Sequence, residues 1–372
     1  IRHCLLSRGL GDVYKRQENI NPVDSGLENQ IYHHGNGSEP QGIDPHIVTG
    51  VPEHHILISL CEGLTIPNPN PNDMNGYMAG TAESWSISDD GKEYIFNLNK
   101  NAKWSNGEPV TADDFVWSWK RILTASLGSQ YPDMLYYLVG AYEYHNGLID
   151  DFDQVGVKSV DKHTLKVNLK NPTPFFLGLL SHYSTWPVHK DTVLKFGDID
   201  DRNGEWTRPG NFVCNGPFQL KTWELNNKIV VEKNPHYYDA SMVRLNEIHY
   251  YPVSNVMTED RMFRAGQLHL TSTLPSQKCP IYIEENPNLT QRQIAEHLGL
   301  SLGKINYLIK ALLGKGMVKV DNFRKSDRKL GYLYLLTPEG VERKRKLTLL
   351  FLQRKAEEFD RLKKEINRID KS

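Results

Sequence analysis

The chain has 372 residues, of which 39% are hydrophobic and 24% are charged, and its formal net charge at pH 7 is −1. This composition excludes a disordered or fibrous protein, and it is sufficient for the cores of about two or three globular domains. No apolar run in the sequence is long enough to cross a bilayer. The cysteines are too few and too scattered for a disulfide framework, which predicts small buried residues or incidental thiols at Cys4, Cys61, Cys214 and Cys279.

The near-neutral total conceals a division of charge along the chain. Residues 284–372 contain about 20 lysines and arginines against about 12 aspartates and glutamates, and the preceding residues carry a net charge of about −9. Such an asymmetry indicates a nucleic-acid or membrane partner for the basic part. The acidity of the larger part argues against DNA binding there.

The first residues lack the pattern of a secretion signal. A signal peptide has a long apolar core, whereas residues 1–17 contain only the apolar run 4–6. Residues 12–17 resemble the translation of a transposon-end adapter used in sequencing libraries. We therefore expect residues 1–26 to be an adapter-derived or disordered leader that replaces the true start. The missing signal then does not argue against export.

From Gln30 onwards, short segments are separated by clusters of Gly, Pro, Asn and Asp, which is typical of a mixed α/β protein. Strands are predicted over 94–98, 164–169 and 228–232, and a turn is predicted over 105–108. The clearest helix is predicted over 112–123, because Thr111 can cap it and two aspartates occupy its first turn. Apolar residues recur on one face of this helix at Phe115, Trp119 and Ile122.

Eight short segments follow one another in a fixed order between residues 27 and 278: residues 37–46, 50–53, 62–64, 82–85, 102–115, 215–218, 232–235 and 263–268. This ordered series resembles the oligopeptide-binding proteins of ABC importers, which are extracellular solute-binding proteins of family 5. The resemblance implies an α/β (α+β) bilobal fold like the type II periplasmic-binding proteins. It also implies a protein outside the cell, in the periplasm or on the cell surface, that has no enzymatic activity and no cofactor.

The same resemblance implies a binding mode and a set of partners. The family binds an extended oligopeptide mainly through its backbone, by β-augmentation, and delivers it to the permease of an ABC transporter. Thr49 and Val51 occupy the positions that pair with the peptide backbone, and Tyr131 occupies a position that lines the ligand. The alternative for Val51 and Tyr131 is that they are ordinary packed residues.

The resemblance covers only the opening part of the family's fold. It implies a first lobe made of residues 27–61 and 180–278, with residues 62–179 as an inserted subdomain. The second lobe, which supplies most contacts to the peptide termini, should begin near Thr271 and is absent. We therefore expect a fold truncated after its first two subdomains, with weak or no peptide binding and an exposed strand edge.

Catalysis by this part is not favoured by the sequence. The features that could indicate catalysis or metal binding are pairs of adjacent carboxylates or histidines, but neighbouring side chains on a strand point to opposite faces. These pairs are residues 33–34, 54–55, 89–90 and 150–151. The sequence contains no GxSxG, HExxH or P-loop motif. Core packing is the favoured role of the tryptophans, with ligand stacking as the alternative.

The basic end predicts a winged helix-turn-helix over residues 289–340. One helix is predicted over 289–299, where Thr290 and Gln293 form a capping box, and a second over 301–313. Strands predicted over 317–320 and 330–336 would form a hairpin whose connection is rich in basic residues. The candidate residues for contacts to double-stranded DNA are Gln291, Ser301, Lys304, Tyr307, Lys310, Arg324, Lys325, Arg328 and Lys329. A generic solvated charge patch is the alternative.

Residues 301–307, 320–323 and 334–340 resemble the MarR-like winged-helix regulators associated with exopolysaccharide loci, which implies a cytoplasmic transcriptional regulator. A long C-terminal helix over residues 341–372 carries an approximate heptad seam at Leu352, Phe359, Leu362, Ile366 and Ile369. This seam predicts a homodimeric coiled coil, although packing on its own domain is the alternative.

Both resemblances end within a junction at residues 279–288. The favoured interpretation is an artificial join between two genes, which makes the chain a chimera. The alternative is a genuine peptide-sensing, DNA-binding transcriptional regulator.

Overall fold

The computed structural model describes residues 21–70, 76–202, 204–273 and 275. Nearer the C-terminus it describes residues 303, 306, 307, 310, 318–322, 332–336, 338, 342 and 346. The chain divides into two compact units. The first contains residues 1–254 and 265–268, and the second contains residues 255–264 and 269–372.

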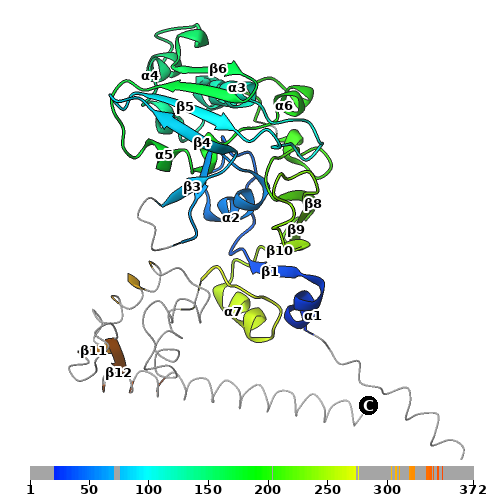
Figure 1. Cartoon of the computed structure of the whole chain (residues 1–372). Coiled ribbons are helices and arrows are strands. Elements are labelled where there is room, and N and C mark those ends of the chain that lie inside the picture. The colour runs from blue at the N-terminus through cyan, green and yellow to red at the C-terminus, as the bar shows by residue number, and fades with distance from the viewer. Residues whose placement is uncertain are drawn as a thin grey trace, which may run out of the picture. The chain divides into compact units, whose positions relative to one another are not determined.

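One four-stranded sheet of the first unit is antiparallel throughout, with the strand order β4-β5-β7-β6 (Figure 1). Its strands are β4 (Ala82–Ile87), β5 (Glu93–Leu98), β6 (Val157–Asp161) and β7 (Thr164–Asn168). Buried and less buried residues alternate along β5 and β7, as expected for strands with one face on a core. A separate two-stranded ribbon pairs β2 (Thr65–Pro67) with β3 (Tyr77–Ala79).

The other four-stranded sheet of the first unit joins segments that are far apart in the sequence. Its order is β1-β10-β9-β8, from β1 (Ile31–Gly35), β8 (Phe218–Glu224), β9 (Lys228–Lys233) and β10 (Glu247–Tyr251). The pair β1 and β10 is parallel, with Ile31 opposite Glu247, and the other two pairs are antiparallel. The predicted strands over 94–98, 164–169 and 228–232 are thus confirmed as β5, β7 and β9, with end residues that differ by one.

The predicted helix over 112–123 is confirmed as α3 (Ala112–Leu123). Thr111 is its N-cap residue, and the carboxylate of Asp114 accepts hydrogen bonds from the Thr111 backbone N–H (2.7 Å) and hydroxyl (3.0 Å). The apolar face of α3 is buried against the β4-β5-β7-β6 sheet. The other α-helices of the first unit are α1 (Pro22–Asn29), α2 (Val51–Leu60), α4 (Ala141–His145), α5 (Phe176–Leu179) and α6 (Lys190–Phe196).

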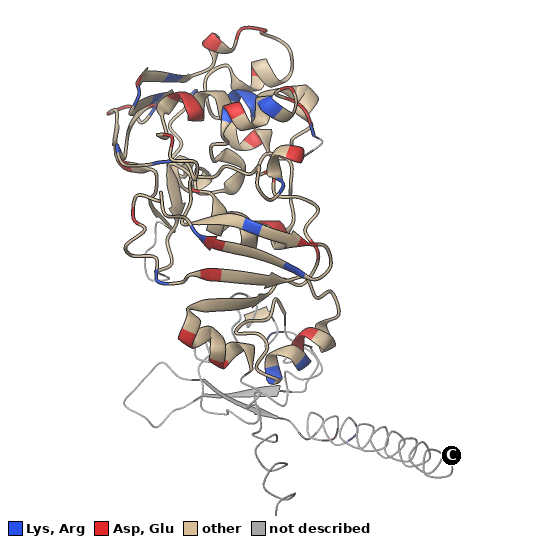
Figure 2. Cartoon of the chain, turned by 90° about the vertical axis from the view of Figure 1, so that its right-hand side faces the viewer, with Lys and Arg blue, Asp and Glu red and all other residues tan. Residues whose placement is uncertain are grey.

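Short 3₁₀ helices complete the first unit. They are η1 (Ala125–Leu127), η2 (Pro132–Leu135), η3 (Phe152–Gln154), η4 (Tyr183–Thr185) and η5 (Glu205–Thr207). Acidic and basic side chains are scattered over the first unit in this view (Figure 2).

The first unit contains two hydrophobic cores. One lies between α3 and the β4-β5-β7-β6 sheet and is built from residues between Leu64 and Leu180. The other lies between α2 and the β1-β10-β9-β8 sheet and draws on residues 43–61 and 183–250. Trp104 and Trp119 are buried in the first core, and the thiols of Cys61 and Cys214 are buried in the second.

In the second unit, α7 (Val256–Arg264) is followed by an antiparallel pair of strands. These are β11 (Val318–Asn322) and β12 (Tyr332–Leu336), with Val318 opposite Leu336, which confirms the predicted hairpin. Of the predicted leader over residues 1–26, the structure describes residues 21–26, and the expectation of disorder is wrong there. Residues 22–26 form the first part of α1, and the Val23 backbone N–H donates a 2.9 Å hydrogen bond to the carbonyl of Gly266. The junction and the heptad positions of the C-terminal helix lie outside the described residues. Among the described helices, none combines the length and apolar character that crossing a membrane requires.

Candidate functional site

Thr49 lies on the segment that leads into α2, and Val51 is the first residue of this helix. Val48 before them is buried, whereas Thr49 is exposed and Val51 is 64% exposed. Within the described residues, the backbone N–H and C=O groups of Thr49 form no hydrogen bond. Free backbone groups on an extended stretch can pair with the backbone of an extended ligand. We call residues 49–51 the ligand edge.

The residues around Gly50 fix the shape of the ligand edge. Gly50 is the N-cap residue of α2, and a Cβ atom there would overlap the carboxylate of Glu53. Glu53 is buried in the first turn of this helix, where the positive end of the helix dipole favours a carboxylate. Its Oε1 accepts a hydrogen bond of 2.7 Å from the Gln41 backbone N–H, which holds the preceding loop against α2.

Aromatic rings of three segments pack beside the ligand edge. The Tyr131 ring meets the His182 ring edge to face at 5.0 Å between centroids, and the His182 and Tyr183 rings lie 4.2 Å apart. His54 of α2 lies 5.6 Å from Tyr183. The Tyr183 hydroxyl donates a 3.1 Å hydrogen bond to the carbonyl of Val48, which attaches these rings to the ligand edge. We call these four residues the aromatic cluster.

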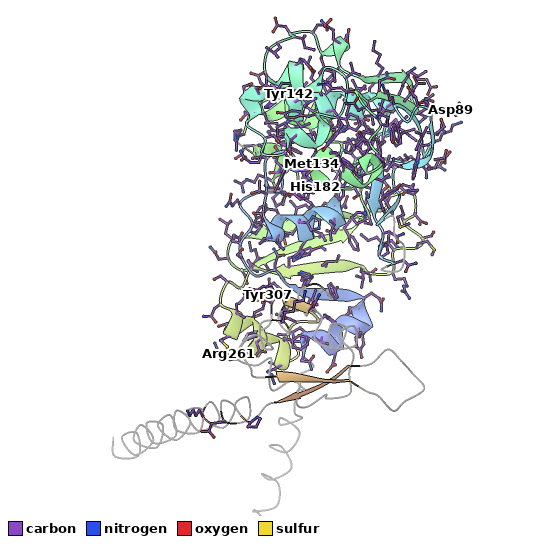
Figure 3. All side chains as sticks on the ribbon, turned by 90° about the vertical axis from the view of Figure 1, so that its left-hand side faces the viewer. Asp89, Met134, Tyr142, His182, Arg261 and Tyr307 are labelled. Carbon is purple, nitrogen blue, oxygen red and sulfur yellow. The ribbon has the colours of Figure 1, made fainter. Side chains whose placement is uncertain are left out.

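Burial favours the uncharged forms of three residues of the aromatic cluster, His54, His182 and Tyr183. It lowers the pKa of His54. It also lowers the pKa of His182, and the proximity of His54 adds to this effect while Asp133 opposes it. Burial raises the pKa of the Tyr183 hydroxyl. His182 lies on the connection into η4, close to Met134 of the neighbouring η2 (Figure 3). The cluster therefore offers rings and neutral polar atoms to a ligand.

A cavity of about 350 Å³ is lined in part by Thr49. It combines polar side chains with an indole ring and two guanidinium groups. Its lining residues are Gln41, Gly42, Ile43, Asp44, Ile47, Val48, Thr49, Gln130, Arg202, Gly204, Thr207, Arg208 and Trp223. Thr49 lines the cavity, and Gln130 of the lining directly precedes Tyr131, so the cavity adjoins both the ligand edge and the segment that carries Tyr131.

The structure brings together the three residues that the resemblance singled out. Thr49 and Val51 form the ligand edge, and Tyr131 reaches it through Tyr183. Sequence reasoning missed His182 and the cavity arginines. A histidine doublet drew attention to His54, but nothing in the sequence linked it to Tyr131. Among the described residues, no group of His, Cys, Asp and Glu is arranged to hold a metal ion.

Of the DNA-contact candidates, Tyr307 and Lys310 fall on described helical positions, and both are exposed. The remaining candidates lie outside the described residues: Gln291, Ser301, Lys304, Arg324, Lys325, Arg328 and Lys329.

Comparison with known proteins identifies the family. The model of the bacterial extracellular solute-binding proteins, family 5 Middle, matches residues 76–312. The chain belongs to this family. It is 41% identical over 248 residues to the periplasmic oligopeptide-binding protein OppA of Escherichia coli (strain K12), a match that covers 66% of this chain and 43% of that protein.

Solved structures of similar proteins share the fold. The complex of Haemophilus influenzae OppA with RPPGFSPFR gives a TM-score of 0.64 at 34% identity, covering 69% of this chain and 49% of that chain. The unliganded open form of the periplasmic murein tripeptide-binding protein MppA gives 0.64 at 33% identity, covering 70% and 48%. These relatives are named as binding proteins, not as enzymes.

The chain spans less than half the length of these relatives, 43% of the Escherichia coli protein and 49% of the Haemophilus chain. The family match ends at residue 312. It therefore runs across residues 279–288, where the sequence predicts a junction, and into the predicted helix-turn-helix.

Proposed function

We propose that the first unit binds oligopeptides, with weak affinity, as the capture protein of an ABC-type peptide importer, outside the cytoplasm and in contact with the importer's permease. The observation that carries this proposal is the ligand edge, an exposed stretch whose Thr49 backbone groups have no hydrogen-bond partner among the described residues. Backbone pairing tolerates many peptide sequences, because each residue of any peptide offers the same donor and acceptor. The relatives named as oligopeptide-binding proteins support the same ligand class.

The Thr49 backbone provides the test. Replacing Thr49 by proline removes the N–H that would pair with the peptide, and we expect peptide affinity to fall about tenfold, the effect of one hydrogen bond. Thr49→Ala removes only the side chain and is expected to stay within about twofold of the original affinity, since recognition is through the backbone. The measurement is calorimetric titration of the full chain with tri- to pentapeptides, with thermal unfolding as a check on folding.

Two results would count against the proposal. One is the absence of binding of any tri- to pentapeptide by the unchanged chain. The other is an equal loss of affinity in Thr49→Ala and Thr49→Pro, which would assign recognition to the side chain.

We also propose that residues 284–370 bind double-stranded DNA as a cytoplasmic homodimer, through a helix-turn-helix and a basic wing. Two observations favour this second function. The strands β11 and β12 form a hairpin whose connecting residues include Arg324, Lys325, Arg328 and Lys329. Tyr307 and Lys310 are exposed at helical positions. Phosphate contacts from such arginines and lysines anchor a protein on DNA without reading its sequence.

For this second function we expect Lys304→Ala and Tyr307→Ala each to lower affinity for duplex DNA about tenfold, measured by fluorescence anisotropy. Affinity should also fall steeply with salt, because phosphate contacts release counterions. Lys346→Ala, at an exposed position of the predicted C-terminal helix, is the control. Indifference to both substitutions would refute the recognition-helix assignment. Peptide-dependent DNA affinity would favour a genuine sensor, and independence would favour a chimera.

A further inference from the structure

The side chains that line the cavity beside the ligand edge favour a ligand group with a negative charge. We propose that it receives an acidic side chain of the bound peptide, held between the guanidinium groups of Arg202 and Arg208, so that acidic peptides are the preferred ligands. This inference rests on the proposed peptide-binding function. The volume of about 350 Å³ is enough for a glutamate side chain together with bridging water.

Arg202 presents a fixed positive charge to the cavity. Its Nη1 donates hydrogen bonds to the backbone carbonyls of Leu127 (2.6 Å) and Gly128 (3.0 Å). Gly128 has a φ of +65°, and a Cβ atom there would lie 2.5 Å from this Nη1. The glycine therefore allows the close approach that holds the guanidinium. Because the side chain is already ordered, a ligand carboxylate does not have to immobilise it.

Arg208 supplies a second guanidinium that is free to bind. It lies on the exposed segment after η5, and within the described part of the chain its side chain forms no hydrogen bond or ion pair. A guanidinium binds a carboxylate through two parallel N–H donors, one to each carboxylate oxygen. A ligand amide has only one oxygen and cannot accept both hydrogen bonds. The pair of arginines thus favours a carboxylate over its amide analogue.

The carboxylate of Asp44 at the cavity wall does not cancel this positive charge. Both of its oxygens accept hydrogen bonds from Arg121, at 2.9 Å and 2.6 Å. Asp44 is the one acidic residue among the described lining residues. Its charge is compensated by a buried arginine, which leaves the two cavity arginines to set the sign of the potential.

Trp223 supplies an apolar surface of the cavity that can pack against the methylene groups of a glutamate. The Trp223 indole lines the cavity, and its Nε1 donates a 2.6 Å hydrogen bond to Glu39, which fixes the ring. The other oxygen of Glu39 accepts from the Asn226 backbone N–H at 3.0 Å. Both oxygens of this carboxylate are therefore engaged behind the ring, and its charge is not directed at the ligand.

The test compares three tripeptides, Ala-Glu-Ala, Ala-Gln-Ala and Ala-Lys-Ala, by calorimetric titration of the full chain. We expect the glutamate peptide to bind about threefold to tenfold more tightly than the isosteric glutamine peptide, and the lysine peptide to bind least tightly. In Arg202→Gln and Arg208→Gln the ratio between the glutamate and glutamine peptides should approach one. Gly128→Ala, which displaces the Arg202 guanidinium without removing it, should also lower the ratio.

Arg244→Gln is the matched control, because Arg244 is an exposed arginine of the same unit that does not line the cavity. It should leave the ratio unchanged. Equal affinity for the glutamate and glutamine peptides, or a preference that survives both cavity substitutions, would overturn the inference while leaving peptide binding intact.

If none of these three tripeptides binds, a smaller probe tests the inference separately from the proposed function. N-acetyl-L-glutamate α-amide offers the acidic side chain without a peptide to pair with the ligand edge. A shift of the Trp223 indole NMR signal with this probe, absent with the glutamine analogue and lost in Arg208→Gln, would support the cavity assignment. The absence of any such shift would overturn it.

Discussion

Replacing Arg121 by methionine is expected to lower the free energy of unfolding by about 3–5 kcal/mol, because it leaves a buried carboxylate without its counter-charge. Arg121 lies on α3 with no exposed surface, and Asp44 is 5% exposed. Burial by itself raises the pKa of Asp44, but the charge and hydrogen bonds of Arg121, together with those of His46, outweigh it and hold this pKa below its usual value. Without Arg121, Asp44 must either stay charged in the core or take up a proton. Urea unfolding followed by tryptophan fluorescence measures the loss.

Two further variants isolate the cause of this loss. Lys166→Met breaks the pair between Lys166 and Glu93, whose side chains are 36% and 38% exposed, and should cost less than about 1 kcal/mol. The double variant Asp44→Asn with Arg121→Met removes the buried charge and should recover part of the stability. The prediction is wrong if Arg121→Met costs no more than Lys166→Met.

The helix α3 could be predicted to the residue because its signals are local. The cap at Thr111 and the recurrence of Phe115, Trp119 and Ile122 lie within the helix or next to it. The strands β5, β7 and β9 were likewise recognisable from their alternation. The pairing of strands could not be predicted in this way. For example, β1 pairs with β10, which joins residues more than two hundred positions apart. Period and composition carry no information on such partners.

The candidate site also contains residues that the sequence pointed to and residues that it could not reveal. Thr49, Val51 and Tyr131 came from a family resemblance, and their roles in binding stay predictions. The cavity could not be predicted, because it needs Arg202, Arg208 and Trp223 from separate loops and strands to meet beside Thr49. The buried ion pair of Asp44 with Arg121 was hidden for another reason. A charged residue in a sequence is usually exposed, and only the fold shows that these two are not.

Relative to the variant Glu62→Gln, the wild-type chain is expected to lose stability as the pH rises from about 5 to about 7.5. Glu62 follows α2, is 2% exposed and accepts hydrogen bonds from the hydroxyls of Tyr237 (2.5 Å), Tyr238 (2.9 Å) and Thr81 (3.2 Å). Burial raises the pKa of Glu62 to about 7, even though these three hydrogen bonds act to lower it.

The sign of the effect follows from which state holds the proton. The carboxyl group has an ordinary pKa of 4.5 in the unfolded chain, so between this value and about 7 the folded chain binds more protons. The stabilisation is complete below pH 4.5 and is lost as the pH passes through 7, with a total on the order of 3 kcal/mol. Glutamine keeps an acceptor for Tyr238 and Thr81 but cannot ionise, so the difference in unfolding free energy between the two proteins should shift in favour of Glu62→Gln by that amount. Equal pH profiles for wild type and Glu62→Gln would show that the carboxyl group is already ionised in the folded chain at pH 5, and that its three hydroxyl donors outweigh its burial.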